Sequence, residues 1–557
     1  IRGINEAAGD VLMGESIKDP GPMKEHFALA LAATLMIGLL PQWGLAAATI
    51  EPKGFDSPSI AAAMQQAGPG DTVQLPAGVF MVAEPLRTKS GVKILGAGQD
   101  KTRLVFRGTK PSVLVSIAGC QDVELAHLTL DGEENPLVQQ GIAGSDSRRL
   151  LLHHLTIRNL VKSETFGPHG ILFSGDNPTM EHGVTDSMIR DCLFENIGLG
   201  AEYGGGIRLN WGCVRNCVQG NVIHNTGRGG IFGDHSAELI IRNNRVSGSG
   251  GEGLGIEIWG GCPRSLIEDN VVDHWISVDQ GNQSAVRRNT IAAEDDSVKA
   301  IGIEIIARDV VVTDNIVKKG QHIGLSVSNV PVKNNVYWAY NTVSGCIQWG
   351  AQLQGEKGGI AHHYFYRCVF ENMVRDDARA TYRQDSGHGF RTNSACRSLV
   401  LEECTIRNNG GMGVQFGGSD LDAIRLVRCT IAGNGLAAVT GPGDCTALEF
   451  VDCAVEKNQS NQLPQAKPFS SAPPTADFRV PAVIRAGEPA SFQCISAPAG
   501  TIVERLWDFG HGIPEVIAEP KHIYEQPGKY RVALIVWDGA GHGARVEKMV
   551  EVLPANR

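Results

Sequence analysis

Residues 221–291 read NVIHNTGRGGIFGDHSAELIIRNNRVSGSGGEGLGIEIWGGCPRSLIEDNVVDHWISVDQGNQSAVRRNTI, and they contain one short motif four times. Each copy begins with an asparagine and places a valine or isoleucine two residues later. A fixed period of this kind indicates a repeat fold. The motif extends in both directions, with cysteine in place of asparagine at the ends: Cys192, Asn221, Asn244, Asn270, Asn289, Asn315, Asn341, Cys368, Cys404, Cys429 and Cys453.

A second element follows most copies of the motif, namely a small residue and then a short alternating strand. Examples are Gly206-Ile-Arg-Leu-Asn, Gly255-Ile-Glu-Ile-Trp and Gly302-Ile-Glu-Ile-Ile. Two or three short strands in about 25 residues, without helical periodicity, predict the coils of a parallel β-helix. Stacked coils put the asparagines in one column, where their side-chain amides can hydrogen-bond from coil to coil. We expect the cysteines of that column to be small buried residues.

The two ends of the chain differ from this repeat. The segment Pro58–Ala67, and Ala61–Gln66 within it, is the one modest helical candidate, and it fits a cap over the open end of a β-helix. Residues 1–22 show no pattern, whereas 23–48 combine Lys24, an apolar run at Phe27–Leu40 and small residues near Ala48. That order is typical of a secretory signal peptide, and the run is too short for a membrane span. We therefore expect an exported protein without a membrane anchor.

Composition supports a globular, exported protein. The chain has 557 residues, 68 of them glycine, and a formal net charge of −10, which argues against a nucleic-acid partner. Thirteen cysteines leave at least one unpaired, and none has the spacing of a zinc site. Structural thiols are the favoured interpretation, with disulfides between columns left open.

The chain resembles two known families. Residues 52–100, with Gly70-Asp-Thr-Val-Gln-Leu-Pro-Ala-Gly-Val and Leu95-Gly-Ala-Gly, are similar to the start of right-handed parallel β-helix proteins of the pectate-lyase-like superfamily. The resemblance implies an all-β fold, a right-handed single-stranded parallel β-helix over residues 49–456. It does not decide the reaction, because that superfamily holds hydrolases, lyases, epimerases and phage adhesins. The galacturonase and mannuronan epimerase signatures are absent.

The C-terminal part carries a separate resemblance. Residues 457–475 contain Pro464, Pro468, Pro473 and Pro474, a composition typical of a stiff linker. Beyond it, Trp507-Asp-Phe-Gly, His522-Ile-Tyr, Pro527-Gly-Lys-Tyr and Leu534-Ile-Val-Trp-Asp resemble a polycystic-kidney-disease (PKD) domain. This resemblance implies a small immunoglobulin-like β-sandwich at residues 476–557. We expect it to be an accessory domain without chemistry of its own.

Alternation along the repeated strand predicts which side chains face solvent. An inward aliphatic residue at the second and fourth positions turns the third and fifth positions outward. Four successive coils then present one carboxylate each, at Asp234, Glu257, Asp279 and Glu304. The lattice of a parallel sheet places the Cα atoms of Glu257 and Asp279 ~8 Å apart. In a later coil, the same reasoning assigns Gln348 and Gly350 to the outward positions.

These four acids are the candidate catalytic residues. Their predicted separation is close to the ~6.5–9.5 Å between the two carboxyl groups of an inverting glycosidase. Crowding of like charges raises one pKa, as a general acid requires. The candidate substrate-binding residues share the same face, where flat rings can cover sugar faces: Arg208, Asn210, His235, Trp259, Trp275 and Arg391.

The sequence therefore predicts a secreted glycoside hydrolase that acts on a polysaccharide, with Glu257 and Asp279 as the acid and base pair and no cofactor. One alternative is a calcium-dependent polysaccharide lyase or uronate epimerase, in which carboxylates hold Ca²⁺ and Arg208 or Arg391 is the base. Another is a non-catalytic glycan-binding adhesin. Solvated acids without a role are the simplest alternative. The sequence does not predict the sugar, the linkage or the oligomeric state.

Overall fold

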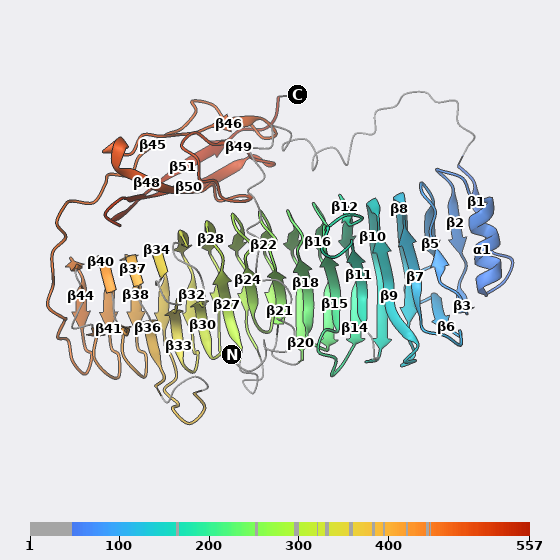
Figure 1. Ribbon diagram of the computed structural model, residues 1–557, viewed down its shortest axis with the longest axis horizontal. Coiled ribbons are helices and arrows are strands. Elements are labelled where there is room, and N and C mark those ends of the chain that lie inside the picture. The colour runs from blue at the N-terminus through green and yellow to red at the C-terminus, as the bar shows by residue number, and fades with distance from the viewer. Residues whose placement is uncertain are drawn as a thin grey trace.

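A computed structural model describes residues 47–162, 166–250, 254–293, 300–319, 321–328, 334–355, 360–380, 385–393, 396–418, 421–441, 445 and 447–556. The proposed signal peptide at 23–48 therefore lies almost wholly outside the described residues. Two domains are present, a long parallel β-helix and a small antiparallel domain that lies along one side of it (Figure 1). Among the described residues, no helix is both long enough and apolar enough to cross a membrane.

One face of the β-helix is a 14-stranded parallel sheet, which we call the long sheet. Its strands follow one another in chain order, one from each coil. They are β4 Leu86–Arg87, β7 Ser112–Ala118, β9 Val138–Ser145, β11 His169–Ser174, β15 Gly205–Asn210, β18 Gly229–Asp234, β21 Leu254–Trp259, β24 Ile276–Asp279, β27 Ile301–Ile306, β30 Ile323–Val327, β33 Trp349–Leu353, β36 His388–Thr392, β39 Val414–Phe416 and β42 Val439–Thr440.

The other strands of the β-helix form two further parallel stacks, which join because the long bent strands β8 Gln121–Asp131 and β10 Ser147–Leu160 belong to both. The first stack adds β1 Thr49–Ile50, β2 Thr72–Leu75, β5 Lys93–Gly96, β12 Val184–Thr185, β13 Met188–Arg190, β16 Cys217–Gln219, β19 Ile240–Arg242, β22 Leu266–Glu268, β25 Ala285–Arg287, β28 Val310–Thr313, β31 Val336–Ala339, β34 Ile360–Tyr366, β37 Cys396–Glu402, β40 Leu421–Val427 and β43 Leu448–Val451. The second stack adds β3 Gly78–Val82, β6 Thr102–Phe106, β14 Leu193–Ile197, β17 Val222–Thr226, β20 Arg245–Ser249, β23 Val271–Val272, β26 Thr290–Ile291, β29 Ile316–Val317, β32 Thr342–Ser344, β35 Val369–Glu371, β38 Thr405–Arg407, β41 Thr430–Ala432 and β44 Ala454–Glu456.

The predicted asparagine ladder is present at the bend between the two stacks. The Oδ1 atom of Asn244 accepts from the backbone N–H of Asn221 at 3.0 Å and from its side-chain amide at 3.0 Å. The same pair of bonds recurs from Asn244 through Asn270, Asn289 and Asn315 to Asn341. Each buried bend thus has its polar groups satisfied by the next coil.

The cysteines at the ends of this column are buried as predicted, except Cys453 in the last coil, which is half-buried. All thirteen cysteines are free thiols, and eleven of them are buried, including Cys368, Cys404 and Cys429 in the ladder column.

The predicted cap is helix α1, Ser57–Gln66, which begins after Asp56. The carboxylate of Asp56 accepts from the N–H of Ser59. Its buried residues join the core of the first coil. A second asparagine ladder, Asn409–Asn434–Asn458, was not predicted.

The C-terminal domain consists of antiparallel strands, as the resemblance implied. They are β45 Phe478–Arg479, β46 Pro489–Ser491, β47 Gln493–Cys494, β48 Ile502–Asp508, β49 Lys521–Ile523, β50 Gly528–Asp538 and β51 Gly543–Val552, with a short 3-10 turn at Ala499–Thr501. Part of the segment before them runs back along the last coils, because Lys467 exchanges two backbone hydrogen bonds with Leu448.

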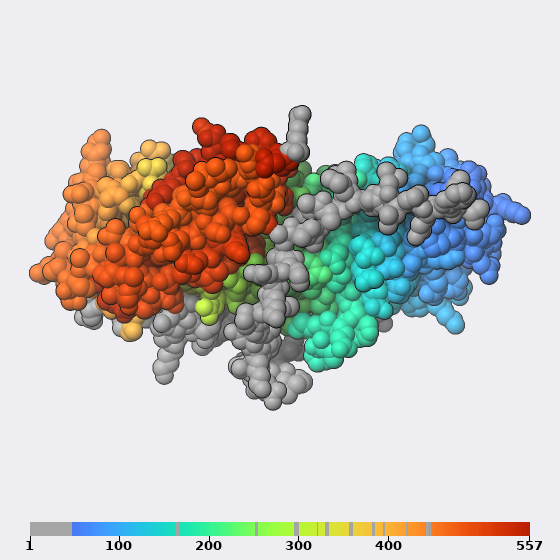
Figure 2. All heavy atoms as spheres, turned by 90° about the horizontal axis from the view of Figure 1, so that it is seen from above, coloured from blue at the N-terminus to red at the C-terminus, as the bar shows by residue number. Residues whose placement is uncertain are grey.

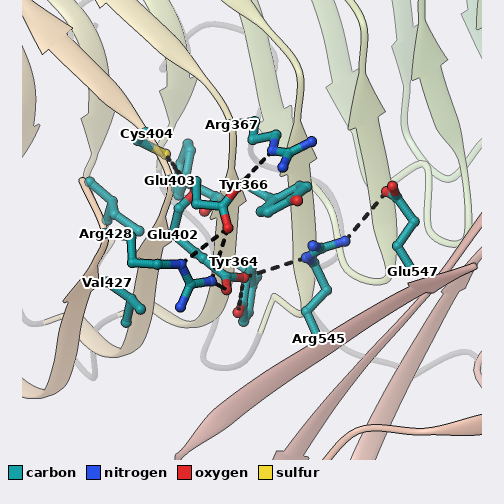
Figure 3. Close-up of polar contacts among 12 residues, drawn as sticks. Tyr364, Tyr366, Arg367, Glu402, Glu403, Cys404, Val427, Arg428, Arg545 and Glu547 are labelled. Atoms are coloured by element: carbon teal, nitrogen blue, oxygen red, sulfur yellow. Dashed lines mark hydrogen bonds and ion pairs between the residues drawn. The ribbon is translucent and has the colours of Figure 1, made fainter. Parts of the chain in front are cut away.

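This domain packs tightly against the first stack (Figure 2). Outward side chains of the stack, among them Tyr337 and Tyr364, share one apolar cluster with Leu506, Ile535 and Trp537 of the C-terminal domain. Polar contacts surround the cluster. Figure 3 shows Arg545 between Glu547 of its own domain and Tyr364 and Glu402 of the β-helix. Its guanidinium carbon lies 3.2 Å from the ring centroid of Tyr366.

Two ion pairs between the domains differ sharply in burial. The side chain of Arg287 on β25 is only 1% exposed and pairs with Asp508 on β48, whereas Arg531 is 39% exposed and pairs with Asp314. Removal of one partner of a buried pair leaves an uncompensated buried charge, whereas an exposed pair contributes little.

We therefore expect Arg287→Ala to lower the free energy of unfolding by about 3–5 kcal/mol, and Arg531→Ala to lower it by about 1 kcal/mol. Urea unfolding of the full chain measures both values. Limited proteolysis of the segment 457–475 shows whether the C-terminal domain has come away from the β-helix. Equal losses of stability in the two variants would contradict this description of the interface.

Candidate active site

The outward face of the long sheet brings the four predicted acids onto four successive strands. The register pairs Arg208 with Phe232, Phe232 with Glu257, Glu257 with Ser277 and Ser277 with Glu304, which makes one column. A second column, two residues further along each strand, contains Asn210, Asp234, Trp259, Asp279 and Ile306. These strands, β15 to β27, lie side by side in the middle of the β-helix (Figure 1).

The same register corrects the assignment in the coil that contains Trp349. Gln352 and not Gln348 continues the first column, because Gln352 pairs with Ser326 on one side and with Arg391 on the other. Gln354 and not Gly350 continues the second column, where it accepts from the side-chain amide of Asn393 at 3.0 Å. The strand begins only at Trp349, so Gly350 is the small residue that precedes the alternating part.

Asp234 is already engaged by its neighbours. Its Oδ2 atom accepts from Arg208 at 2.9 Å, and its Oδ1 atom lies 2.6 Å from Nδ1 of His235. Arg208 also donates to Asn210 at 2.8 Å, and both Arg208 and Asp234 are buried. Each oxygen of Asp234 therefore already has a partner, one a cation and the other an imidazole. Asp234 forms part of the wall of the site and fixes the positions of these two groups.

Glu304 lies deeper and is held by three donors. Its Oε2 atom accepts from Trp275 Nε1 at 3.2 Å and from Ser277 Oγ at 3.3 Å, and its Oε1 atom accepts from Ser328. Burial raises the pKa of Glu304 from 4.5 to about 7, although these hydrogen bonds oppose the rise. Trp275 is thereby a fixed part of the wall, half-buried against Ile301 and Trp349.

Glu257 and Asp279 are the two acids with the most accessible surroundings. The Glu257 side chain is 15% exposed, and its Oε2 atom lies 3.6 Å from Nη2 of Arg228. Burial raises the pKa of Glu257; Arg228 and Arg208 oppose this rise, and the charges of Asp279 and Asp234 add to it. Burial also raises the pKa of Asp279, against hydrogen bonds from Gln280 and Trp259. One coil and two residues separate the pair, so their Cα atoms lie ~8 Å apart.

Aromatic rings border the second column. Trp259 is 44% exposed and pairs with Asp234 on the neighbouring strand. Its ring meets His235 edge to face at 5.6 Å, and His235 in turn stacks on Trp211 at 4.2 Å. An exposed indole held beside buried carboxyl groups is the kind of surface on which a sugar ring can lie.

Arg391 lies in a separate polar cluster on the long sheet. It is three coils from Glu304, a distance of ~14 Å along the stack. It donates to Asp385 at 3.2 Å and lies over the ring of Trp349 at 4.6 Å. Asp385 also lies 2.6 Å from His388 Nε2, and the backbone of Met412 donates to the other ring nitrogen of His388. The register thus keeps Arg391 in the predicted column, three coils beyond the last of the four acids.

The four acids do not form a metal-ligand cage in the part of the chain that the structure describes. No three of them bring their oxygens within 4.8 Å of one another. Seven-coordinate or eight-coordinate Ca²⁺ needs several oxygens at 2.3–2.6 Å from one point.

Comparison with known proteins places the two domains in families. The right handed beta helix region family matches residues 115–274 and 218–373, and the PKD domain family matches residues 471–552. Collagenase ColQ1 of Bacillus cereus (strain Q1) is 47% identical over 53 residues, which are 10% of this chain and 6% of the collagenase. The chain thus spans only a small part of that relative.

Two solved structures illustrate the likeness. The PKD1 domain of the Vibrio cholerae metalloprotease PrtV is 29% identical and covers 15% of this chain and 99% of that domain, with a TM-score of 0.14. A mannuronic acid specific polysaccharide family 6 lyase from human gut microbiota is 17% identical and covers 59% of this chain and 82% of the lyase, with a TM-score of 0.41. The chain is therefore a right-handed parallel β-helix protein with a C-terminal PKD domain.

Proposed function

We propose that this protein is an exported enzyme that hydrolyses a glycosidic bond in a polysaccharide, with inversion at the anomeric carbon. The observation that carries the proposal is the pair Glu257 and Asp279. Both carboxyl groups have a raised pKa, they stand on neighbouring strands, and Trp259 beside them is exposed. Their ~8 Å Cα separation is compatible with the ~6.5–9.5 Å carboxyl separation that leaves room for a water molecule.

The chemistry needs one proton on the pair. Because the two carboxyl groups repel each other when both are charged, loss of the first proton makes loss of the second harder. This repulsion favours a singly protonated pair. The protonated member donates to the glycosidic oxygen as the bond to the anomeric carbon breaks. The ionised member takes a proton from the water that attacks the opposite face of the sugar.

The other two acids support this pair. Asp234 fixes Arg208 and His235, so the positive charge near Glu257 has a defined position. Glu304 orients Trp275 and adds a group with a pKa of about 7 to the same column. Trp259 and His235 offer the apolar and polar surfaces against which a sugar packs.

Hydrolysis accounts for the site better than a calcium-dependent lyase or epimerase. Such a reaction requires carboxylates gathered around Ca²⁺ and an arginine free to act as base. Both candidate arginines are held by carboxylates, Arg208 by Asp234 and Arg391 by Asp385. The leader-like segment 23–48 supports export. The net charge of −10 supports a neutral or weakly charged glycan as the substrate.

Glu257→Gln and Asp279→Asn should each lower kcat by about 10²–10⁴-fold, because each removes a proton donor or acceptor at the reacting atoms. A panel of polysaccharides, assayed for new reducing ends, identifies the substrate and measures the loss. Glu195→Gln, on β14 in the second stack, is the matched control and should keep full activity.

Three results would contradict the proposal. Full activity in both variants removes the pair from the mechanism. An ultraviolet-absorbing unsaturated product that disappears with a chelator identifies a lyase. Binding of a polysaccharide without turnover identifies an adhesin.

The raised pKa of Glu304 predicts a pH dependence of stability. The unfolded chain releases the Glu304 proton near pH 4.5, whereas the folded chain keeps it until about pH 7. The contribution of Glu304 is therefore fully present below pH 4.5, falls as pH rises to about 7, and is constant above that. Its total change is about 3 kcal/mol.

Glu304→Gln should remove this decline, since glutamine does not titrate. Urea unfolding at about pH 5 and about pH 8 compares the free energy of unfolding of the variant with that of the wild type and of Glu195→Gln. An equal decline in all three proteins would show that Glu304 is not the group that titrates.

A further inference from the structure

Three histidines form a cluster at the N-terminal end of the β-helix, away from the long sheet. They are His127 on β8 and His153 and His154 on β10. One ring nitrogen from each lies within 4.8 Å of the other two. They are the only group of three or more histidine, cysteine or acidic side chains in the described part of the chain that meets so closely.

The backbone register creates this cluster. Ala126 pairs with His153 and Leu128 with Leu155, so His127 lies opposite His154 on the next coil. Both residues occupy the bend at which β8 and β10 pass from the first stack to the second, with φ of 61° and 49°. Their rings lie 5.0 Å apart, and each is 5.0–5.2 Å from the ring of His153.

Hydrogen bonds fix which nitrogen of His153 faces the cluster. Its Nε2 atom lies 3.1 Å from Oε1 of Glu124, and the other oxygen of Glu124 lies 3.1 Å from Nζ of Lys93. The carboxylate accepts, so Nε2 of His153 carries the proton and Nδ1 keeps its lone pair. This carboxylate–histidine pairing orients the imidazole ligands of metal sites.

The lone pair of His153 points at another ring nitrogen. Nδ1 of His153 lies 2.8 Å from Nδ1 of His154. Two nitrogens at this distance either share one proton or bind a common electrophile. In a tetrahedral zinc site with Zn–N distances of ~2.0–2.1 Å, ligand nitrogens are ~3.3 Å apart. The separations among the three histidines, from 2.8 Å to at most 4.8 Å, bracket that value.

We propose that His127, His153 and His154 bind one divalent transition-metal ion of the Zn²⁺ type, with Glu124 as the hydrogen-bond partner that orients His153. Imidazole nitrogen is a preferred ligand of Zn²⁺, and three protein ligands leave the fourth position to water. The ion would connect two successive coils near the capped end of the β-helix (β8 and β10 in Figure 1). The site lies on other strands than Glu257 and Asp279, and it does not depend on the proposed hydrolysis.

Calorimetric titration of the chelator-treated full-length protein with ZnCl₂ tests the proposal. We expect one Zn²⁺ per chain. His127→Asn and His154→Asn should each weaken binding about 100-fold or more, because each removes a direct ligand. Asparagine tolerates the positive φ of these positions, so the backbone is preserved. Glu124→Gln should weaken binding about 10–100-fold, as expected for a partner of a ligand.

Two controls separate metal binding from loss of fold. His224→Asn changes a histidine on β17 whose Nδ1 atom lies 2.9 Å from Oγ of Ser247, and it should bind Zn²⁺ like the wild type. Added Zn²⁺ should raise the melting temperature of the wild type and of Glu257→Gln, but not that of His154→Asn. Equal Zn²⁺ affinity in the wild type and His154→Asn would overturn the proposal, as would the absence of Zn²⁺ binding to the wild type.

Discussion

The fold depends on the exact stacking of buried asparagines at one bend. From Asn244 to Asn341, each ladder asparagine accepts two bonds from the asparagine of the preceding coil, and the first, Asn221, accepts one from the backbone of Cys192. Each also donates to a backbone carbonyl, as Asn221 does to Ile189 at 3.1 Å. A shift of one residue in any coil would leave several of these buried groups without partners, each at a cost of about 1–3 kcal/mol. The ladder therefore fixes the register of the neighbouring strands, and with it the columns on the long sheet.

A fixed register explains why much of the site was predictable. The alternation of Gly255-Ile-Glu-Ile-Trp correctly predicted the outward positions of Glu257 and Trp259, because inward aliphatic residues leave no other choice. The same reasoning gave a wrong assignment in the coil that contains Trp349, where two aliphatic residues could each take the first inward position. Assigning Gln348 and Gly350 to the outward positions makes Ile347 the first inward residue, whereas Ala351 is the residue that pairs with Leu325. Gly350, in line with Gly324 and Gly389, was the signal that marked the true start.

Contacts between distant segments were beyond the sequence pattern. Tyr337 and Tyr364 are outward aromatic residues on the first stack, and they are buried only because Trp537 and Ile535 cover them. His127 and His154 are 27 residues apart and belong to no motif, so only the register of β8 and β10 brings them together. The environments of the acids are equally invisible in the sequence. Four carboxylates in similar positions differ because Arg208 pairs with Asp234, whereas burial raises the pKa of Glu304 to about 7.

The two domains share coils but use different faces of them. The apolar cluster of the PKD domain covers strands β28 to β37 of the first stack, and Asp508 reaches Arg287 on β25, whereas the acids stand on β18 to β27 of the long sheet. The ion pairs of Arg287 of the β-helix with Asp508 and of Arg545 of the PKD domain with Glu402 hold the PKD domain in one orientation, unlike a domain on a free linker. The apolar side chains of the PKD domain cover Tyr337 and Tyr364, which would otherwise be exposed to solvent. The PKD domain thus covers outward aromatic residues of the first stack, whereas Glu257 and Asp279 lie on the long sheet.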